Sequence, residues 1–173
     1  SARQAIYSRY KIIHKGSIDF KNSGNNAIYA DIKIKTDTIR FYNIHLQSLS
    51  IDKNKENFGE KDSEKLFMRF KKTFAMQEDQ VMKILKNASE SPYKTIFMGD
   101  FNNTALSWAY KKLKGNKTDA FLEAGNGFGK SFDYIFPFRI DFILADPKIT
   151  LKNFKTYNVK YSDHYPIMAW IQL

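Results

Sequence analysis

The sequence contains no cysteine and only three histidines among its 173 residues. The absence of cysteine excludes a disulfide framework, a thiol nucleophile and a cysteine-ligated zinc site. No apolar run approaches the roughly 18–20 residues that a membrane-spanning helix needs, and no signal-peptide pattern opens the chain. Internal repeats and linkers rich in Pro, Gly and Ser are also missing, so we expect a single domain over residues 1–173.

The composition indicates a globular and strongly basic protein. Hydrophobic residues make up 43% of the chain and aromatic residues 16%, which is enough apolar side chain for a real core. The 28 Lys and Arg against 18 Asp and Glu give a net charge of +10. Such a surface attracts polyanions, above all nucleic acid, or an anionic membrane face. Because the lysines are spread along the chain, a solvated surface with no partner is an equally open interpretation.

Hydrophobic periodicity predicts several strands. Apolar and polar residues alternate over residues 26–35 and 38–47, which predicts a β-hairpin. The remaining predicted segments are strands over 93–101, 139–146, 149–159 and 166–173, and loops over 50–62 and 125–130.

Two segments read as helices. Apolar residues recur at helical spacing over residues 63–87, with Asp62 or Ser63 as the N-cap, and a shorter helix is expected over 106–113. We expect the aromatic residues of the long helix, such as Phe67 and Phe74, to lie in the core. Together with the strands, these helices indicate an α/β fold with one or two sheets covered by helices.

Polar side chains occur near one end of four predicted strands, where a buried face would otherwise be apolar. In chain order they are Asn43, His45 and Gln47; Asp100 and Asn102; Arg139 and Asp141; and Asp163 and His164. If the first two strands run antiparallel to the last two, all four sets meet at one edge of a sheet. Each set alone has an ordinary explanation as a turn, a helix cap or an ion pair, but one shared site explains all four placements.

The residue types at this edge favour metal-assisted chemistry. Histidine, carboxylates and amides without cysteine suit a hard ion such as Mg²⁺ or Mn²⁺ better than structural zinc. A histidine oriented by an aspartate can act as a general base or hold a charged oxygen. A serine hydrolase built on Ser162 is rejected, because the adjacent Asp163 and His164 would point apart on extended chain and no G-x-S-x-G motif is present.

Four motifs carry a resemblance to a known family. "YNIHLQS", "IFMGDFNNT", "RIDFIL" and "YSDHYPIMAWI", in this order and spacing, resemble the endonuclease/exonuclease/phosphatase superfamily of DNase I-like proteins. The opening "QAIYSRYKI" resembles the strand that precedes these motifs. The resemblance implies a four-layer α/β/β/α sandwich and Mg²⁺-dependent hydrolysis of phosphoester bonds.

The resemblance also implies a role for each motif residue. His164 would activate water or bind the scissile phosphate, with Asp141 orienting it. Asp100 and Asn102 would hold the nucleophilic water, and His45 would contact the phosphate or assist the leaving group. The remaining assignments are Asp163 in the metal shell, Asn43 and Gln47 as phosphate-binding or supporting groups, and Arg139 as a structural residue.

One part of the family pattern is missing. The resemblance implies an upstream strand whose Glu is the principal Mg²⁺ ligand, and no Glu of this sequence lies in a matching context. We therefore expect the chain to be the C-terminal two-thirds of the domain, N-terminally truncated, with weak metal binding and little activity of its own. Exposed strand edges would favour self-association. We expect a cytoplasmic domain, while some bacterial family members carry upstream membrane helices that would anchor the parent protein.

Two functions stand at this point. The leading hypothesis is a Mg²⁺-dependent phosphodiesterase or phosphomonoesterase, whether endonuclease, exonuclease or phosphatase. The alternative is a non-catalytic basic module that binds nucleic acid or anionic lipid. Metal dependence separates the two, because binding by a basic module should instead weaken steeply with salt.

Overall fold

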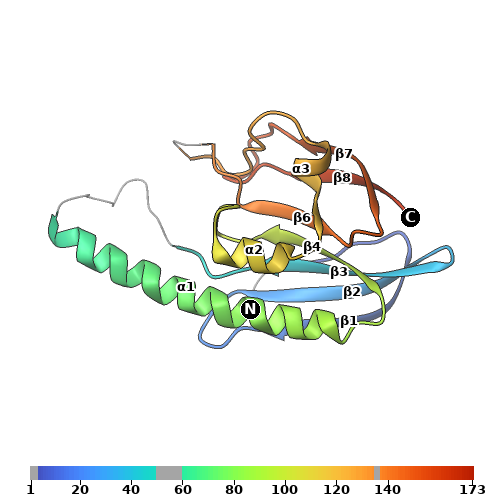
Figure 1. The fold of residues 1–173 in the computed structure, drawn as a ribbon, viewed down its shortest axis with the longest axis horizontal. Helices are drawn as coiled ribbons and strands as arrows, with labels where there is room; N and C mark the ends of the chain where they lie inside the picture. Colours follow the sequence, from blue (N-terminus) through green and yellow to red (C-terminus); the bar gives the residue numbers. More distant parts are fainter. Residues whose placement is uncertain (1–3, 50–59, 135–136) are drawn as a thin grey trace.

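The structure is a computed structural model that describes residues 4–49, 60–134 and 137–173, apart from the side chains of residues 60–62. These residues form a six-stranded sheet and a two-stranded sheet, with helices packed against them (Figure 1). No helix in these ranges is both long enough and apolar enough to cross a membrane.

The six-stranded sheet brings the polar strand ends to one edge. Its order is β1 (Lys11–Asp19), β2 (Asn26–Ile34), β3 (Asp37–His45), β4 (Lys94–Asp100), β6 (Asp141–Ala145) and β5 (Thr118–Asp119). β2 and β3 form the predicted antiparallel hairpin, β4 runs parallel to β3, and β6 runs antiparallel to β4. The ends of β3 and β4 therefore meet the start of β6, as the sequence predicted, whereas Asp163 and His164 precede a strand of the two-stranded sheet and not of this one.

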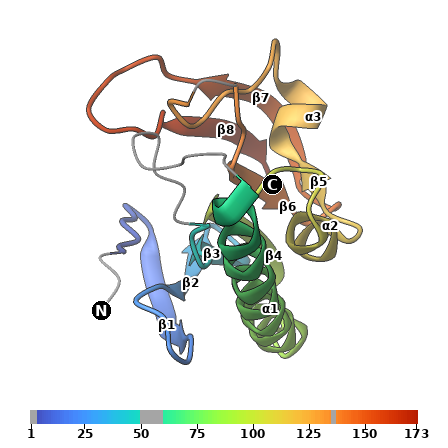
Figure 2. The ribbon, with the colours of Figure 1, turned by 90° about the vertical axis from the view of Figure 1, so that its left-hand side faces the viewer.

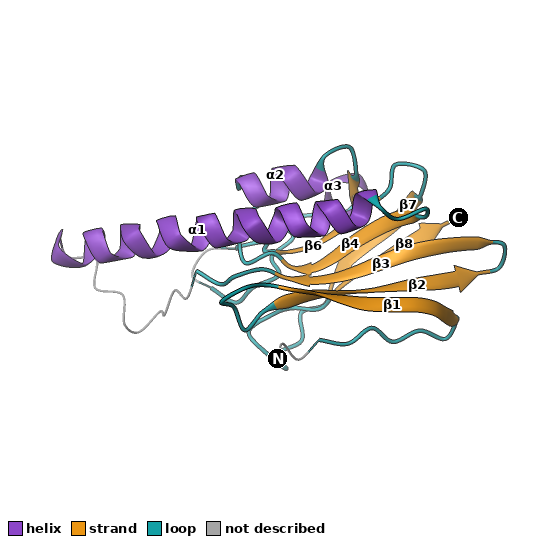
Figure 3. Cartoon of the chain, turned by 90° about the horizontal axis from the view of Figure 1, so that it is seen from below, coloured by secondary structure: helices purple, strands orange, loops and turns teal. Residues whose placement is uncertain are grey.

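Helices α1 (Glu60–Ser89) and α2 (Trp108–Lys114) cover one face of this sheet (Figure 3). α1 joins β3 to β4, and parallel neighbours need a long crossover of this kind. The core between helices and sheet contains Tyr42, Ile44, Leu46, Val81, Ile84, Phe97, Phe101, Leu113 and Phe142. Ser107 caps α2 by accepting a hydrogen bond from the Tyr110 amide.

The long helix differs from its prediction at its N-terminal half. α1 begins at Glu60, so neither Asp62 nor Ser63 is its N-cap. Val81 and Ile84 are fully buried, but Phe67 is 65% and Phe74 is 47% exposed, so the prediction that these aromatic residues lie in the core is wrong. The first turns of α1 extend beyond the strands (Figure 1). Periodicity identifies the apolar face of a helix, but not how far the sheet beneath it reaches.

A second core lies on the opposite face of the large sheet. Strands β7 (Thr150–Thr156) and β8 (Ile167–Gln172) pair antiparallel, and α3 (Ala120–Ala124) packs beside β7. Figure 2 shows α1 and α2 on one side of the large sheet, and β7 and β8 on the other. The second core is built from Ile39, Ile96, Ala120, Ala145, Ile149, Leu151 and Phe154. Helices, sheet and second sheet follow the layer order of the expected sandwich, so the predicted fold class is confirmed.

Several boundaries shift from the prediction. The opening strand is β1 at Lys11–Asp19, whereas residues 4–10 form no strand. The short elements β5 and α3 were not predicted. The strand expected over 149–159 ends at Thr156. Of the loop expected over 50–62, residues 50–59 lie outside the described residues, and the remainder is helical.

Candidate active site

Strand register places the central side chains side by side. His45 pairs with Asp100 across β3 and β4, and Asp100 pairs with Asp141 across β4 and β6. A cavity of about 390 Å³ opens at this point. Its lining includes His45, Ser48, Asp100, Asn102, Asn103, Thr104, Phe132, Tyr134, Phe138, Ile140, Asp163 and His164.

The close approach of β3 and β4 depends on a glycine. Gly99 has a φ of 125°, and a Cβ atom at this position would lie 2.2 Å from the backbone oxygen of Ile44. No side chain fits at that distance, so the glycine allows β4 to deliver Asp100 next to His45.

His164 and Asp141 form a hydrogen-bonded pair. His164 Nδ1 lies 2.9 Å from Asp141 Oδ2, although the two residues are far apart in sequence. This hydrogen bond raises the pKa of His164 to about 8. At neutral pH the imidazole is therefore largely protonated, with its Nε2 facing Asp100 Oδ2 at 4.0 Å.

Asp100 lies at the centre of the site. Its Oδ1 accepts a hydrogen bond of 2.7 Å from the Asn102 amide, while its Oδ2 is 3.6 Å from His45 Nε2. Burial, and then the negative charge of Asp141, raise the pKa of Asp100 to about 7. Burial and the neighbouring His164 lower the pKa of His45. The site therefore combines a cationic imidazole, a neutral imidazole and a carboxylate close to half ionised at neutral pH.

Asn102 belongs to the same turn. Its φ of 49° is left-handed, a conformation that asparagine tolerates better than most residues. Its Nδ2 donates a hydrogen bond of 2.9 Å to the backbone oxygen of Leu46. The Asn102 side chain therefore ties the turn after β4 to the segment after β3.

A serine that the sequence did not reveal supports the His164–Asp141 pair. Ser131 is completely buried, and its Oγ accepts hydrogen bonds of 3.0 Å from the amides of both Ile140 and Asp141. Its backbone oxygen accepts a further hydrogen bond from the Tyr165 amide. Ser131 thus holds the segments that carry Asp141 and His164 in place. No periodicity or motif distinguishes this loop serine in the sequence.

Two glutamines of α1 support the opposite side of the site. Gln77 Nε2 donates to the backbone oxygen of Gln47 at 2.8 Å, and Gln77 Oε1 accepts from Asn103 Nδ2 at 3.0 Å. Gln80 Oε1 accepts from the Gln47 amide at 2.8 Å. Both glutamines are buried, and together they hold the segments after β3 and β4. Two polar residues on the apolar face of a predicted helix are a sequence signal that would have identified them.

Three other predicted residues lie away from the centre. Asn43 donates to the backbone oxygen of Ala5 at 3.3 Å, Gln47 accepts from Ser23 at 2.8 Å, and neither lines the cavity. Their proposed contact with phosphate stays a prediction. Arg139 forms an ion pair of 2.8 Å with Asp119 rather than with Asp141.

The donor set fits a hard divalent cation. One possible ligand atom from each of Asp100, Asp141 and His164 lies within 4.8 Å of the others. The two carboxylates suit Mg²⁺ or Mn²⁺, whereas His164 would have to lose its proton to join them as a ligand. Burial is the main cause that raises the pKa of Asp100 to about 7, and a cation beside this carboxylate would favour its ionised form. Asp163 lines the same cavity but is not in this group, so its place in a metal shell remains a prediction.

Comparison with solved structures shows the same fold in several proteins. The mannosyl-6-phosphatase of Bacteroides thetaiotaomicron has 16% identity and a TM-score of 0.66, with 95% of this chain and 67% of that chain covered. A protein of the endonuclease/exonuclease/phosphatase family from Leptotrichia buccalis has 20% identity and a TM-score of 0.67, with 96% and 64% covered. D. rerio TDP2, complexed with a single-strand DNA product, has 17% identity and a TM-score of 0.66, with 95% and 69% covered.

The chain therefore spans about two-thirds of the length of each of these proteins. A comparison with curated proteins found no match. The family model described as "Endonuclease/Exonuclease/phosphatase family" matches residues 2–164, nearly the whole chain. On this evidence, the chain belongs to the endonuclease/exonuclease/phosphatase family.

Proposed function

We propose that this chain carries the catalytic edge of a metal-dependent phosphoesterase. The observation that carries the proposal is the convergence of Asp100, Asp141 and His164 from three separate segments, with one carboxylate or imidazole atom of each within 4.8 Å of the others. Next to the hydrogen-bonded His164–Asp141 pair, the buried carboxylate of Asp100 has a pKa of about 7, which lowers stability at neutral pH and is useful for acid–base chemistry.

The side chains divide the work of hydrolysis by their charges. Asp100 takes the proton of a water molecule as that water attacks phosphorus and the bond to the leaving oxygen breaks. A base with a pKa near the working pH is well matched to this transfer. Asn102 orients the water from the neighbouring position in the turn. When bound, a divalent cation would neutralise charge on the phosphate oxygens.

The two histidines serve the phosphate. Protonated His164, fixed by Asp141, stabilises the negative charge that develops on the phosphoryl oxygens. His45, whose pKa is lowered, contacts the phosphate from β3 or assists the leaving group. Asp163 at the mouth of the cavity contributes to the metal shell, and Asn43 and Gln47 support the site.

The substrate class is a phosphoester, and similar structures show both a phosphomonoesterase and a DNA complex. One neighbour is a mannosyl-6-phosphatase, and another is complexed with single-strand DNA. The net charge of +10 favours a polyanionic substrate over a small sugar phosphate. The same charge also supports the alternative function, a basic module that binds nucleic acid or anionic lipid without turnover.

Hydrolysis of bis-p-nitrophenyl phosphate tests the proposal. The assay compares Mg²⁺, Mn²⁺ and EDTA, and it uses both this chain and a version extended by the N-terminal segment in which the family resemblance places a Glu ligand. We expect metal-dependent turnover in the extended chain and little turnover in residues 1–173. Turnover that EDTA leaves unchanged, or none in the extended chain, would contradict the proposal.

Two substitutions test the site in the active version. His164→Ala and Asp100→Ala should each lower turnover at least ~100-fold, the scale of a lost acid–base or electrostatic group. Lys152→Ala, an exposed position on β7, is the matched control and should have no effect. Rates like those of the unmodified protein in either site variant would remove these residues from the mechanism.

A further inference from the structure

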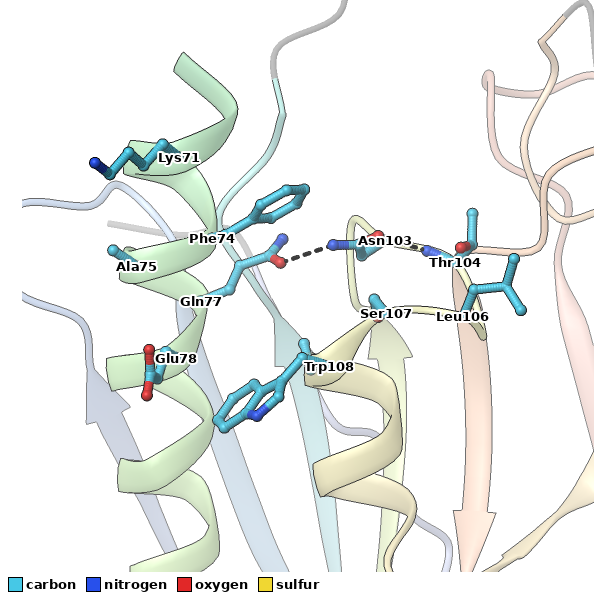
Figure 4. Close-up of a pocket in the computed structure, with 11 residues that line it drawn as sticks. Lys71, Phe74, Ala75, Gln77, Glu78, Asn103, Thr104, Leu106, Ser107 and Trp108 are labelled. Carbon is cyan, nitrogen blue, oxygen red and sulfur yellow. Dashed lines mark hydrogen bonds between the residues drawn. The ribbon is translucent and has the colours of Figure 1, made fainter. Parts of the chain in front are cut away.

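A second cavity lies between α1 and α2, beside the candidate active site. Its volume is about 620 Å³. We call it the α1–α2 groove and define it by Phe74, Gln77, Asn103, Thr104 and Trp108, which Figure 4 shows around the opening. α1 supplies the first two residues, and α2 with the turn before it supplies the rest.

The groove continues from the active-site cavity. Asn103 and Thr104 line both cavities, directly after the segment that carries Asp100 and Asn102. The two cavities therefore adjoin at the turn after β4, so a molecule held at the active site by its phosphate lies next to the groove. This continuity makes a second part of the same substrate the natural occupant.

The walls of the groove carry exposed aromatic rings. Phe74 is 47% and Trp108 is 42% exposed, although both sit next to the core of the helical layer. Figure 4 shows the two rings on either side of the hydrogen bond between Gln77 and Asn103. Large apolar side chains gathered in a cavity beside a polar site are characteristic of ligand binding.

Hydrogen bonds fix the base of the groove before any ligand binds. Buried Gln77 holds the Asn103 side chain, and Asn103 Oδ1 accepts a further hydrogen bond of 2.9 Å from the Thr104 amide. Ser107 caps α2 and so sets the position of Trp108. The aromatic rings are therefore presented from a backbone that is already ordered, which reduces the entropy lost on binding.

The positive charges around the groove suit an anionic polymer that carries planar groups. Lys71 and Glu78 are the charged residues of the lining. A further cation, Lys112, has its Nζ 5.6 Å from the centre of the Trp108 ring. Lys71 and Glu78 balance each other within the lining, and Lys112 adds a positive charge beside Trp108.

We propose that the α1–α2 groove binds a nucleobase of single-stranded nucleic acid, next to the nucleotide whose phosphate occupies the active site. The inference rests on the proposed function and specifies its substrate class. Every base has an aromatic face that can stack on Phe74 or Trp108, and the flanking lysines suit its phosphates. A hydrocarbon chain would use the rings but not the lysines, and free phosphate would use the lysines but not the rings.

Tryptophan fluorescence gives a direct test that needs no turnover. The chain has two tryptophans, so Trp170→Phe leaves Trp108 as the only one. In EDTA, a single-stranded oligodeoxynucleotide of about ten residues, within the usual site size, should quench Trp108. An abasic oligomer of the same length has the same phosphates without bases. It should bind at least about fivefold more weakly and cause little quenching.

Substitutions of the rings separate stacking from charge, with binding measured by fluorescence anisotropy of a labelled oligomer. Trp108→Ala and Phe74→Ala should each weaken binding of the base-bearing oligomer at least about fivefold and leave the abasic oligomer unaffected. Trp108→Phe keeps an aromatic ring, so it should retain most of the affinity that Trp108→Ala loses. This variant excludes misfolding as the cause of that loss. Trp170→Ala is the matched control, because Trp170 on β8 is also 42% exposed.

The outcomes distinguish this inference from the proposed function. Equal affinity for the two oligomers, or unchanged affinity in Trp108→Ala, overturns the nucleobase site even when bis-p-nitrophenyl phosphate is hydrolysed. Quenching of Trp108 by mannose 6-phosphate but not by oligonucleotides also overturns it, in favour of a sugar. Base-dependent binding in a protein that never hydrolyses bis-p-nitrophenyl phosphate supports the groove and rejects the phosphoesterase.

Discussion

At the level of single residues, the hydrogen bond between His164 and Asp141 sets the charge of the imidazole. The pKa of His164 rises from 6.5 to about 8, so the stabilisation by this pair is complete below pH 6.5 and lost as pH rises through about 8. Asp141→Asn should return the pKa towards 6.5, measured by NMR titration of the ring in EDTA. The loss in melting temperature should be larger at about pH 6 than at about pH 9.

Asp146→Asn is the matched control for this titration, because Asp146 follows the other end of β6. It should leave the pKa of His164 at about 8. A His164 titration that is identical in Asp141→Asn and the unmodified chain would mean that the hydrogen bond does not govern the charge.

In contrast to the charge of His164, the charge of Asp100 destabilises the fold. Its pKa rises from 3.8 to about 7, so the folded state binds the extra proton and loses stability as pH rises between these values. Asp100→Asn keeps an acceptor for the Asn102 amide and removes the buried charge. In EDTA at about pH 8, we expect its melting temperature to rise by about 2 °C or more, a shift that about 1 kcal/mol gives in a chain of this size.

The gain should disappear at about pH 4, where the Asp100 carboxyl is protonated in the unmodified protein as well. Asp163→Asn removes a carboxylate that lines the same cavity but is exposed, and it should change the melting temperature little. A gain in Asp100→Asn that is equal at both pH values would show that charge is not its cause.

At the level of elements, α1 does more than cover the sheet. Gln77 bonds to the Gln47 backbone and to Asn103, so it joins the segments that follow β3 and β4. Gln77→Met keeps the shape of the side chain and leaves buried polar groups without partners, which costs about 1–3 kcal/mol. We expect a lower melting temperature and a lower kcat with KM less affected, because the displaced groups position the catalytic turn.

Lys86→Met is the control for this substitution, since Lys86 is exposed on the same helix and lines neither cavity. It should leave both stability and kcat close to those of the unmodified protein. If Gln77→Met lowers the melting temperature but leaves kcat unchanged, the glutamine is structural and does not position the site.

The strands and their polar ends were predictable from the sequence because side chains alternate with period two. Alternation alone placed His45 on one face of its strand. The predicted end of the strand now seen as β4 indicated Asp100 and Asn102 as polar residues at its edge. The family resemblance, rather than periodicity, supplied the pairing of His164 with Asp141. Ser131 was not predictable, because its role consists of hydrogen bonds to the backbone of a segment remote in sequence.

The exposure of Phe74 shows a related limit at the level of elements. Helical spacing placed it among the core residues of α1, but at this part of the helix Thr73 and Gln77 are buried and Phe74 is exposed. The same reason makes the α1–α2 groove invisible in the sequence, since it depends on how α2 lies beside α1.

At the level of the whole molecule, the site depends on how the second sheet docks. His164 lies just before β8, whereas Asp100 and Asp141 belong to the large sheet. The second core joins the two sheets, so its packing fixes the distance across the His164–Asp141 pair. β1 and β8 also form sheet edges in the described residues, which is the basis for the proposed self-association.

A substitution far from the cavity tests this dependence. Phe154 on β7 packs edge-on against Phe121 of α3, with ring centres 5.7 Å apart. Phe154→Leu should cost about 1–2 kcal/mol and loosen the docking of the second sheet. The pKa of His164 should then fall from about 8 towards 6.5 as its contact with Asp141 weakens.

Trp170→Leu, on an exposed position of β8, should leave this pKa unchanged. A Phe154→Leu protein that melts earlier but keeps a His164 pKa of about 8 would show that local contacts, such as those of Ser131, hold the pair independently of the second core.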